Sequence, residues 1–229
     1  MSDRPSIEIY SIGTELLNGQ IQDTNSFWMA QQIAALGGYV RRIAILDDDM
    51  AELTGVLTDA CTRGTRVVIT TGGLGPTPDD MTVEAIAQIM GVQTEIDESL
   101  VARYMESRNI ATREDVNPGL VKMATKPVGA WAHPNPAGVA PCVESQIGDT
   151  TIFSLPGPPR EVEALFRQSV EDRLAEIYDD LDAVAASHPM GRIGEPADFG
   201  RIVAFLCSET ANYVNGTGLP VEGGSLLES

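Results

Sequence analysis

Apolar residues in the first part of the chain alternate between short continuous runs and runs with helical spacing. Continuous runs at 7–12, 39–46 and 66–71 are typical of strands that are buried on both faces. Between them, apolar residues from Leu53 to Cys61 recur at i, i+3, i+4, i+7 and i+8, which predicts an amphipathic helix. Strands and helices that alternate in this way predict an α/β fold with a doubly wound, mostly parallel sheet.

Another helix is expected between the first two strands. Asp23 or Thr24 supplies its N-cap, because side-chain oxygens at that position accept hydrogen bonds from free N–H groups of the first turn. The residues that helical spacing predicts to face the core are Phe27, Ala30, Ile33 and Ala34. A further helix is expected at 83–90, after the third strand.

Turn residues divide the rest of the chain into shorter elements. In chain order we expect a helix around 100–105, a helix that begins at Asn117-Pro118, a loop at 127–141, a β-hairpin at 143–147 and 150–155, and a long helix after Pro159. We therefore expect one domain at 1–178, a linker at 179–188 and an α+β segment at 189–229.

Composition excludes several classes of function. The 229 residues carry a formal net charge of −18, which disfavours nucleic acid as a partner, because phosphate backbones attract clustered Lys and Arg. Such an acidic surface would suit high salt, where self-repulsion is screened. No apolar run is long enough to cross a membrane. The widely spaced Cys61, Cys142 and Cys207 form no disulfide pattern, so we expect a cytoplasmic protein.

The most informative segment is 70–82, where an apolar strand runs into three glycines, two aspartates and a helix start. The residues expected to bind phosphate here are Thr71, Gly72, Gly73, Gly75 and Thr82. Glycines let backbone N–H groups approach a phosphate, and the start of the following helix adds positive potential. The segment matches neither common nucleotide-binding glycine motif. An alternative reading is a glycine-rich turn in which Asp79 or Asp80 only caps the helix.

Two other segments leave predicted strands and enter predicted helices. The first follows the opening strand and offers Thr14, Glu15, Asp23 and Asn25. The second contains Pro156 and Gly157 and precedes the long helix. Because ligands in open α/β sheets bind beyond the carboxyl ends of the strands, we expect all three segments to line one crevice. The alternative for each alone is turn chemistry and a helix cap.

Together these segments resemble the molybdopterin-binding (MoaB/Mog) domain, in the version at the N-terminus of CinA proteins. The resemblance covers about 6–175 and rests on 12–21, 23–25, 70–82, 135–141 and 155–159. It implies a three-layer α/β fold and adds Gly138 to the expected ligand-binding residues. Cys142 departs from the glycine usual in the family, and Pro78 departs from a lysine common in relatives, which removes a charged phosphate contact.

The family resemblance implies two reactions in one pocket. Relatives include metal-dependent hydrolases that cleave the pyrophosphate of ADP-ribose, and enzymes that transfer adenylate from ATP to molybdopterin. A non-catalytic pterin- or nucleotide-binding module is the third possibility. For either reaction we expect Asp79 and Asp80 to bind Mg²⁺ or a similar ion and Glu15 to join them in catalysis. We also expect a homo-oligomer, and the deamidase activity of whole CinA proteins is not carried over.

The last segment, 189–229, resembles the carboxyl end of short-chain dehydrogenases. In that family this stretch carries neither the catalytic residues nor the glycine loop that binds the cofactor. The chain contains no Tyr-x-x-x-Lys, since Arg108 stands at that spacing after Tyr104. We therefore expect a non-catalytic fragment and no dehydrogenase activity.

Overall fold

The computed structural model describes residues 5–178, 189–191, 194, 196–212, 214 and 218–221. The chain divides into a larger compact unit, Pro5–Ile177, and a smaller one that includes Tyr178–Ser229. The candidate site lies entirely in the larger unit. Within the described ranges, no helix is both long and apolar enough to span a bilayer.

A six-stranded sheet forms the centre of the larger unit, with strand order β2-β1-β3-β8-β7-β6. Its strands are β1 (Ser6–Ile12), β2 (Tyr39–Leu46), β3 (Val67–Thr71), β6 (Trp131–His133), β7 (Cys142–Ile147) and β8 (Thr150–Leu155). The pairs β1–β2, β1–β3 and β3–β8 are parallel, whereas β7 pairs antiparallel with both β8 and β6. The expected mostly parallel sheet and the hairpin are confirmed.

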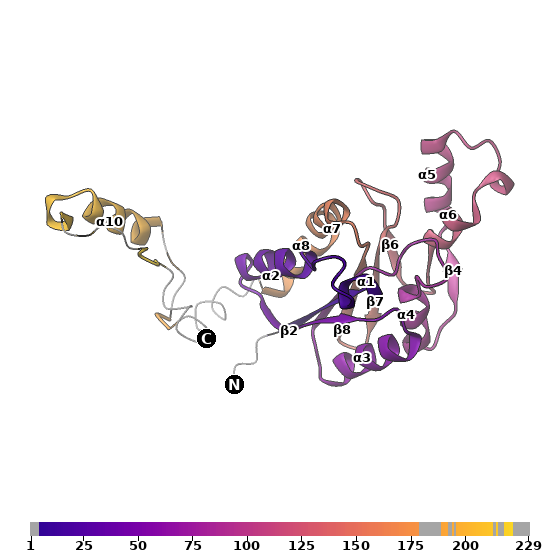
Figure 1. The fold of residues 1–229 in the computed structure, drawn as a ribbon, viewed down its shortest axis with the longest axis horizontal. Helices are drawn as coiled ribbons and strands as arrows, with labels where there is room; N and C mark the ends of the chain where they lie inside the picture. The colour runs from indigo at the N-terminus through magenta and orange to yellow at the C-terminus, as the bar shows by residue number, and fades with distance from the viewer. Residues whose placement is uncertain are drawn as a thin grey trace. The chain divides into compact units, whose positions relative to one another are not determined.

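Helices cover both faces of this sheet, which gives the expected three layers (Figure 1). One face carries α2 (Asn25–Ala35), α7 (Pro159–Leu165), the π-helical turn η2 (Phe166–Val170) and α8 (Glu171–Tyr178), and the other carries α3 (Met50–Thr62) and α4 (Thr82–Met90). On the α3–α4 side, Leu53, Leu57 and Ile86 pack against Tyr10 and Val68 of the sheet. On the other side, the ring of Trp28 in α2 meets Phe166 edge-on, with centroids 5.4 Å apart.

A smaller substructure lies beyond the sheet (Figure 1). It contains β4 (Thr94–Ile96), α5 (Glu98–Arg108), η1 (Arg113–Asp115), α6 (Pro118–Met123) and β5 (Thr125–Pro127), with β4 and β5 antiparallel. Leu100, Tyr104 and Leu120 belong to its own apolar core. As the sequence predicts, Asn117 caps α6, because its Oδ1 accepts a hydrogen bond of 2.8 Å from the N–H of Gly119.

An ion pair between the buried Glu8 and the partly exposed Arg63 lies at the amino end of the sheet. The Glu8 side chain is fully buried in β1, and its carboxylate accepts hydrogen bonds from Arg63 (2.8 Å), Thr65 (2.8 Å) and the Tyr10 hydroxyl. Burial alone would raise the pKa of Glu8, but these hydrogen bonds and the charge of Arg63 lower it to about 2. The carboxylate therefore stays ionised inside the protein.

Two expectations about local structure are wrong. The buried residues of α2 are Ser26, Met29 and Ile33, so Ile33 alone of the four expected residues is buried, and Phe27 is 67% exposed. Ser26 turns inward because its hydroxyl and its N–H both donate to Asp23, so a polar residue is satisfied in the interior. The segment 127–141 also contains β6, whose pairing with β7 a single-strand pattern does not reveal.

The smaller unit contains α10 (Pro196–Leu206) and η3 (Glu209–Ala211). The helix agrees with the dehydrogenase-like pattern of the sequence. The expected linker at 179–188 lies outside the described residues, as do 213, 215–217 and 222–229 of the expected α+β segment. The proposed domain boundaries stay a prediction.

Candidate ligand pocket

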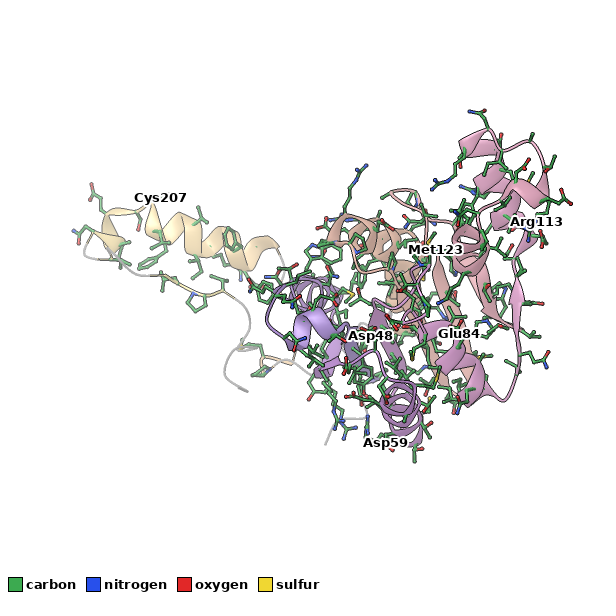
Figure 2. The ribbon with its side chains drawn as sticks, turned by 45° about the vertical axis from the view of Figure 1, so that its right-hand side comes forward. Asp48, Asp59, Glu84, Arg113, Met123 and Cys207 are labelled. Carbon is green, nitrogen blue, oxygen red and sulfur yellow. The ribbon has the colours of Figure 1, made fainter. Side chains whose placement is uncertain are left out.

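The carboxyl ends of β1, β2, β3 and β8 meet at one edge of the sheet because these strands are parallel. The loops that follow them enclose a pocket of about 740 Å³, a volume typical of small-molecule sites. Two of its lining residues, Asp48 after β2 and Met123 in α6, are labelled in Figure 2. The predicted residues that line it are Glu15, Asp23, Asn25, Thr71, Gly72, Gly73, Gly75, Asp79, Asp80, Pro156 and Gly157.

The first loop contains α1 (Thr14–Leu17) and is held by hydrogen bonds to three carboxylates. Asp23 accepts from Ser11 (2.8 Å) and from Ser26, so this side chain supports the loop and starts α2. Thr14 donates its N–H to Asp48 at 3.0 Å and its hydroxyl to Asp47. The carboxylate of Glu15, by contrast, has no hydrogen-bond partner among the described residues and lies in the pocket wall.

The glycine loop begins where Gly72 donates its N–H to the carbonyl of Leu155 at 3.0 Å. Gly73 has a φ of 65°, and a Cβ there would overlap the hydroxyl oxygen of Thr82, which itself donates to the carbonyl of Gly72 at 3.1 Å. The absent side chain therefore leaves room for Thr82 rather than directly for a phosphate. Within the described residues, the N–H groups of Gly73, Leu74 and Gly75 donate to no protein acceptor.

The two aspartates of this loop differ in their partners. Asp80 accepts hydrogen bonds from the N–H (2.8 Å) and hydroxyl (2.6 Å) of Thr77, and so closes a turn. Asp79 has no such partner in the described part of the chain. Neither caps α4, because the N-cap is Met81 and no side chain caps it. The alternative reading of these aspartates as helix caps is wrong.

The third loop joins the other two. Thr71 donates its hydroxyl to the carbonyl of Pro156 at 2.8 Å, and Asn25 donates its amide to Thr71 (3.2 Å) and to the carbonyl of Gly157 (2.7 Å). An added Cβ at Gly157 would meet nothing within 4 Å. Asn25 and Thr71 thus fix three loops around the pocket.

Three predicted residues do not line the pocket. Thr14 is turned toward the aspartates after β2, and Thr82 is buried beneath the glycine loop. Gly138 lies against the carboxylate of Glu161, which leaves no room for a Cβ. All three support pocket-forming segments instead.

Sequence reasoning missed Glu161 and Asp48, both of which line the pocket. The carboxylate of Glu161, in the first turn of α7, accepts a hydrogen bond of 2.6 Å from Asn135. Asn135 also donates to the carbonyl of Ala140 at 2.8 Å and accepts from the N–H of Ala137 at 2.9 Å. Asn135 and Gly138 stand in one sequence motif, which was a signal for a structured segment. Their common partner Glu161 could not be identified from it, because Glu161 lies 23 to 26 residues further along the chain.

The pocket is acidic. Among the described residues, its lining includes the carboxylates of Glu15, Asp23, Asp48, Asp79, Asp80 and Glu161 and no Lys, Arg or His. Hydrogen bonds from the protein occupy four of them, and only Glu15 and Asp79 are without such bonds among the described residues. In the same part of the chain, no three Asp, Glu, His or Cys side chains are grouped so as to hold a metal ion by themselves.

Comparison with known proteins supports membership of the molybdopterin-binding domain family. The family described as "Probable molybdopterin binding domain" matches residues 8–176, and one described as "Enoyl-(Acyl carrier protein) reductase" matches 166–225. A structure of CinA from Thermoplasma acidophilum, whose function is stated to be unknown, is 33% identical, with a TM-score of 0.68 over 75% of this chain and 99% of that one.

Two relatives extend this comparison. A protein of Pyrobaculum arsenaticum is 44% identical over 72% of this chain and 62% of its own length. A CinA-like protein of Myxococcus xanthus is 36% identical over 76% of this chain and 41% of its own length. The chain thus spans less than two thirds of either relative. It belongs to the molybdopterin-binding domain family and is similar, within that family, to CinA proteins.

Proposed function

We propose that the pocket binds the diphosphate of an ADP-ribose-like nucleotide and hydrolyses it with the help of a divalent metal ion. The observation that carries this proposal is that two sets of groups in the pocket have no hydrogen-bond partner among the described residues. Backbone N–H groups of Gly73, Leu74 and Gly75 adjoin a pocket that also exposes the carboxylates of Glu15 and Asp79. N–H groups suit phosphate oxygens, and free carboxylates suit a cation or a water molecule.

The charge of the pocket argues for a cation that enters with the ligand. A diphosphate would face six carboxylates and no basic side chain in the lining, so its own negative charge would be repelled. Oxygen donors fit Mg²⁺, and the candidate ligands are Asp79 and the Oδ1 oxygen of Asp80, whose Oδ2 is bonded to Thr77. Phosphate oxygens and water would complete the coordination. When bound, Mg²⁺ would neutralise charge on the diphosphate.

The chain's own groups would perform the remaining steps. N–H donors of the glycine loop would orient the diphosphate, and the network of Asn25 and Thr71 would keep the loops in place. The carboxylate of Asp79 or Glu15 would accept a proton from the attacking water. Water adds to one phosphorus as the bridging P–O bond breaks, so ADP-ribose and water give AMP and ribose 5-phosphate.

Transfer of adenylate from ATP to the phosphate of molybdopterin is the second candidate. It is favoured by the match of most of the chain to a molybdopterin-binding family. The same N–H groups and carboxylates would act, but the leaving group would be pyrophosphate and the acceptor would be the pterin phosphate in place of water. A binding module without catalysis is the remaining possibility.

One assay separates these functions. The protein is incubated with ADP-ribose and Mg²⁺, or with molybdopterin, ATP and Mg²⁺, and AMP, ribose 5-phosphate, adenylated pterin and pyrophosphate are quantified by chromatography. The proposal expects AMP and ribose 5-phosphate in the first mixture, formed about a hundredfold or more slowly by Asp79→Asn. Adenylated pterin in the second mixture alone supports transfer. Ligand binding by calorimetry without any product supports the binding module.

Two further expectations accompany this proposal. The three cysteines described are free, which is typical of a reducing setting such as the cytoplasm. We also expect the protein to be a homo-oligomer, with a small-molecule phosphate as ligand and neither nucleic acid nor membrane as partner. Size-exclusion chromatography with light scattering tests the oligomeric state.

A further inference from the structure

Helix α6 meets the glycine loop along one of its faces. Gly119, Lys122 and Met123 are spaced i, i+3, i+4 and so lie on the same side of the helix. Gly119 packs so closely that an added Cβ would lie 2.8 Å from the Cβ of Pro76. Met123, labelled in Figure 2, lines the ligand pocket. This face of α6 therefore packs against the glycine loop and supports it.

Lys122 makes the polar contacts of this face. Its ammonium donates a hydrogen bond of 2.7 Å to the backbone carbonyl of Asp80 and another to the carbonyl of Thr77. These two carbonyls stand at the ends of the turn that Asp80 closes through its carboxylate. The ammonium of Lys122 thus binds the carbonyls at both ends of the turn, while the carboxylate of Asp80 binds Thr77 within the turn. Hydrogen bonds from a charged donor are among the strong ones in proteins.

The ammonium contacts the loop outside the lining of the ligand pocket. Lys122 is not among the lining residues of the large pocket. It lines a small neighbouring cavity instead, and that cavity shares Gly73, Gly75 and Asp80 with the pocket. The same short loop therefore lines both hollows, and a direct contact between the ammonium and a bound phosphate is not needed for its effect.

We propose that Lys122 is a positioning residue for the ligand pocket. By holding the carbonyls of Thr77 and Asp80, it fixes the turn that carries Asp79 and follows the N–H groups of Gly73 to Gly75. A loop that is ordered before the ligand arrives loses less conformational entropy on binding, which raises affinity. The ligand named in the test rests on the function proposed above, whereas the ordering of the loop does not.

The chain offers a matched control, because Lys122 and Lys126 are its only lysines. Lys126, in β5, pairs with Glu95 at 2.5 Å and is absent from the pocket lining. Lys122→Met and Lys126→Met remove the same charge and keep a similar aliphatic stem. Lys122→Arg keeps a charged donor at the first position. Thermal unfolding of all three variants, compared with the unsubstituted protein, shows whether each is folded.

The first measurement needs no ligand. Hydrogen–deuterium exchange is followed by mass spectrometry on peptides that cover 72–81. We expect Lys122→Met to exchange severalfold faster there, while Lys126→Met exchanges at the unsubstituted rate. Unchanged exchange in Lys122→Met overturns the inference, whatever the activity of the protein. Equal acceleration in both variants also overturns it, because the effect would then come from net charge alone.

The second measurement uses ADP-ribose with Mg²⁺. Lys122→Met is expected to raise KM roughly tenfold, as expected for the loss of hydrogen bonds from a charged group, with a smaller change in kcat. Lys122→Arg should restore most of the affinity. An unchanged KM in Lys122→Met overturns the positioning role. If the unsubstituted protein neither binds nor cleaves ADP-ribose, the proposed function fails, and the exchange measurement still decides the role of Lys122.

Discussion

The side-chain amide of Asn25 donates a hydrogen bond of 2.7 Å to the backbone carbonyl of Gly157, across 132 positions of sequence. The same amide donates to Thr71, so one side chain joins the first, second and third loops of the pocket. Asn25→Ala removes both bonds while the backbone of α2 is preserved. We expect ligand affinity to fall by roughly fivefold to thirtyfold, since each of the two bonds contributes about 1 kcal/mol. Calorimetry that shows full affinity would contradict this role.

The two aspartates of the glycine loop should separate chemistry from stability. Asp79 has no protein partner in the described residues, whereas Asp80 is bonded twice to Thr77. Asp79→Asn is expected to lower turnover by about a hundredfold or more with an unchanged melting temperature. Asp80→Asn should lower both, with a loss of stability of about 1 kcal/mol. Equal melting temperatures and equal turnover for the two variants would contradict the assignment.

Two glycines of the pocket make a second matched pair. Gly73 has a positive φ and no space for a Cβ beside Thr82, so Gly73→Ala should destabilise the protein by about 1–2 kcal/mol or more. Gly157 has open space at its Cβ position, and Gly157→Ala should melt like the unsubstituted protein. Differential scanning calorimetry checks this. A stable Gly73→Ala would show that the loop adapts.

Acid should weaken the buried pair of Glu8 and Arg63. The pKa of Glu8 is about 2 in the folded protein and 4.5 in the absence of these contacts. Because the folded value is the lower one, its stabilising contribution is complete above about pH 5 and is lost as the pH falls toward 2. Glu8→Gln should cost about 2–3 kcal/mol at pH 7. Chemical denaturation should show the gap between the two proteins closing at low pH; a constant gap would contradict the pKa.

The C-terminal segment should be dispensable for ligand binding. All described residues that line the pocket lie between Ile12 and Glu161, within the larger unit. Truncation of the chain after Asp182 is expected to leave ligand affinity and most of the thermal stability unchanged. Calorimetry and thermal unfolding of the truncated protein check this expectation. A large loss of either would show that 189–229 is an integral part of the fold.

Much of the site follows from the direction of the strands. Because β1, β3 and β8 are parallel, the segments after Ile12, Thr71 and Leu155 had to share one edge, and the sequence predicts that edge from strand–helix alternation alone. The glycine pattern adds the loop. Neither the strand–helix alternation nor the glycine pattern depends on which residues are in contact, so both can be recognised from the sequence alone.

Side-chain partners are less accessible to sequence reasoning. Phe27 fits the apolar stripe of α2 better than Ser26, yet Ser26 is buried because Asp23 bonds to it. Lys122 lies 42 residues from Asp80 and Glu161 lies 26 from Asn135, so only the folded chain brings each pair together. The residue type predicts which kinds of hydrogen bond a polar side chain can form, but its actual partner is determined by the fold.

The buried pair of Glu8 and Arg63 lies at the amino end of the sheet, and the ligand loops leave the carboxyl end. Groups this far apart with no shared partner usually change free energy additively. Substitutions at the amino end of the sheet can therefore change stability to heat and acid, while substitutions in the loops at the carboxyl end change ligand specificity. A double variant of Glu8 and Asp79 should lose stability and turnover by the sum of the single losses. Stability and activity can then change independently of each other during evolution.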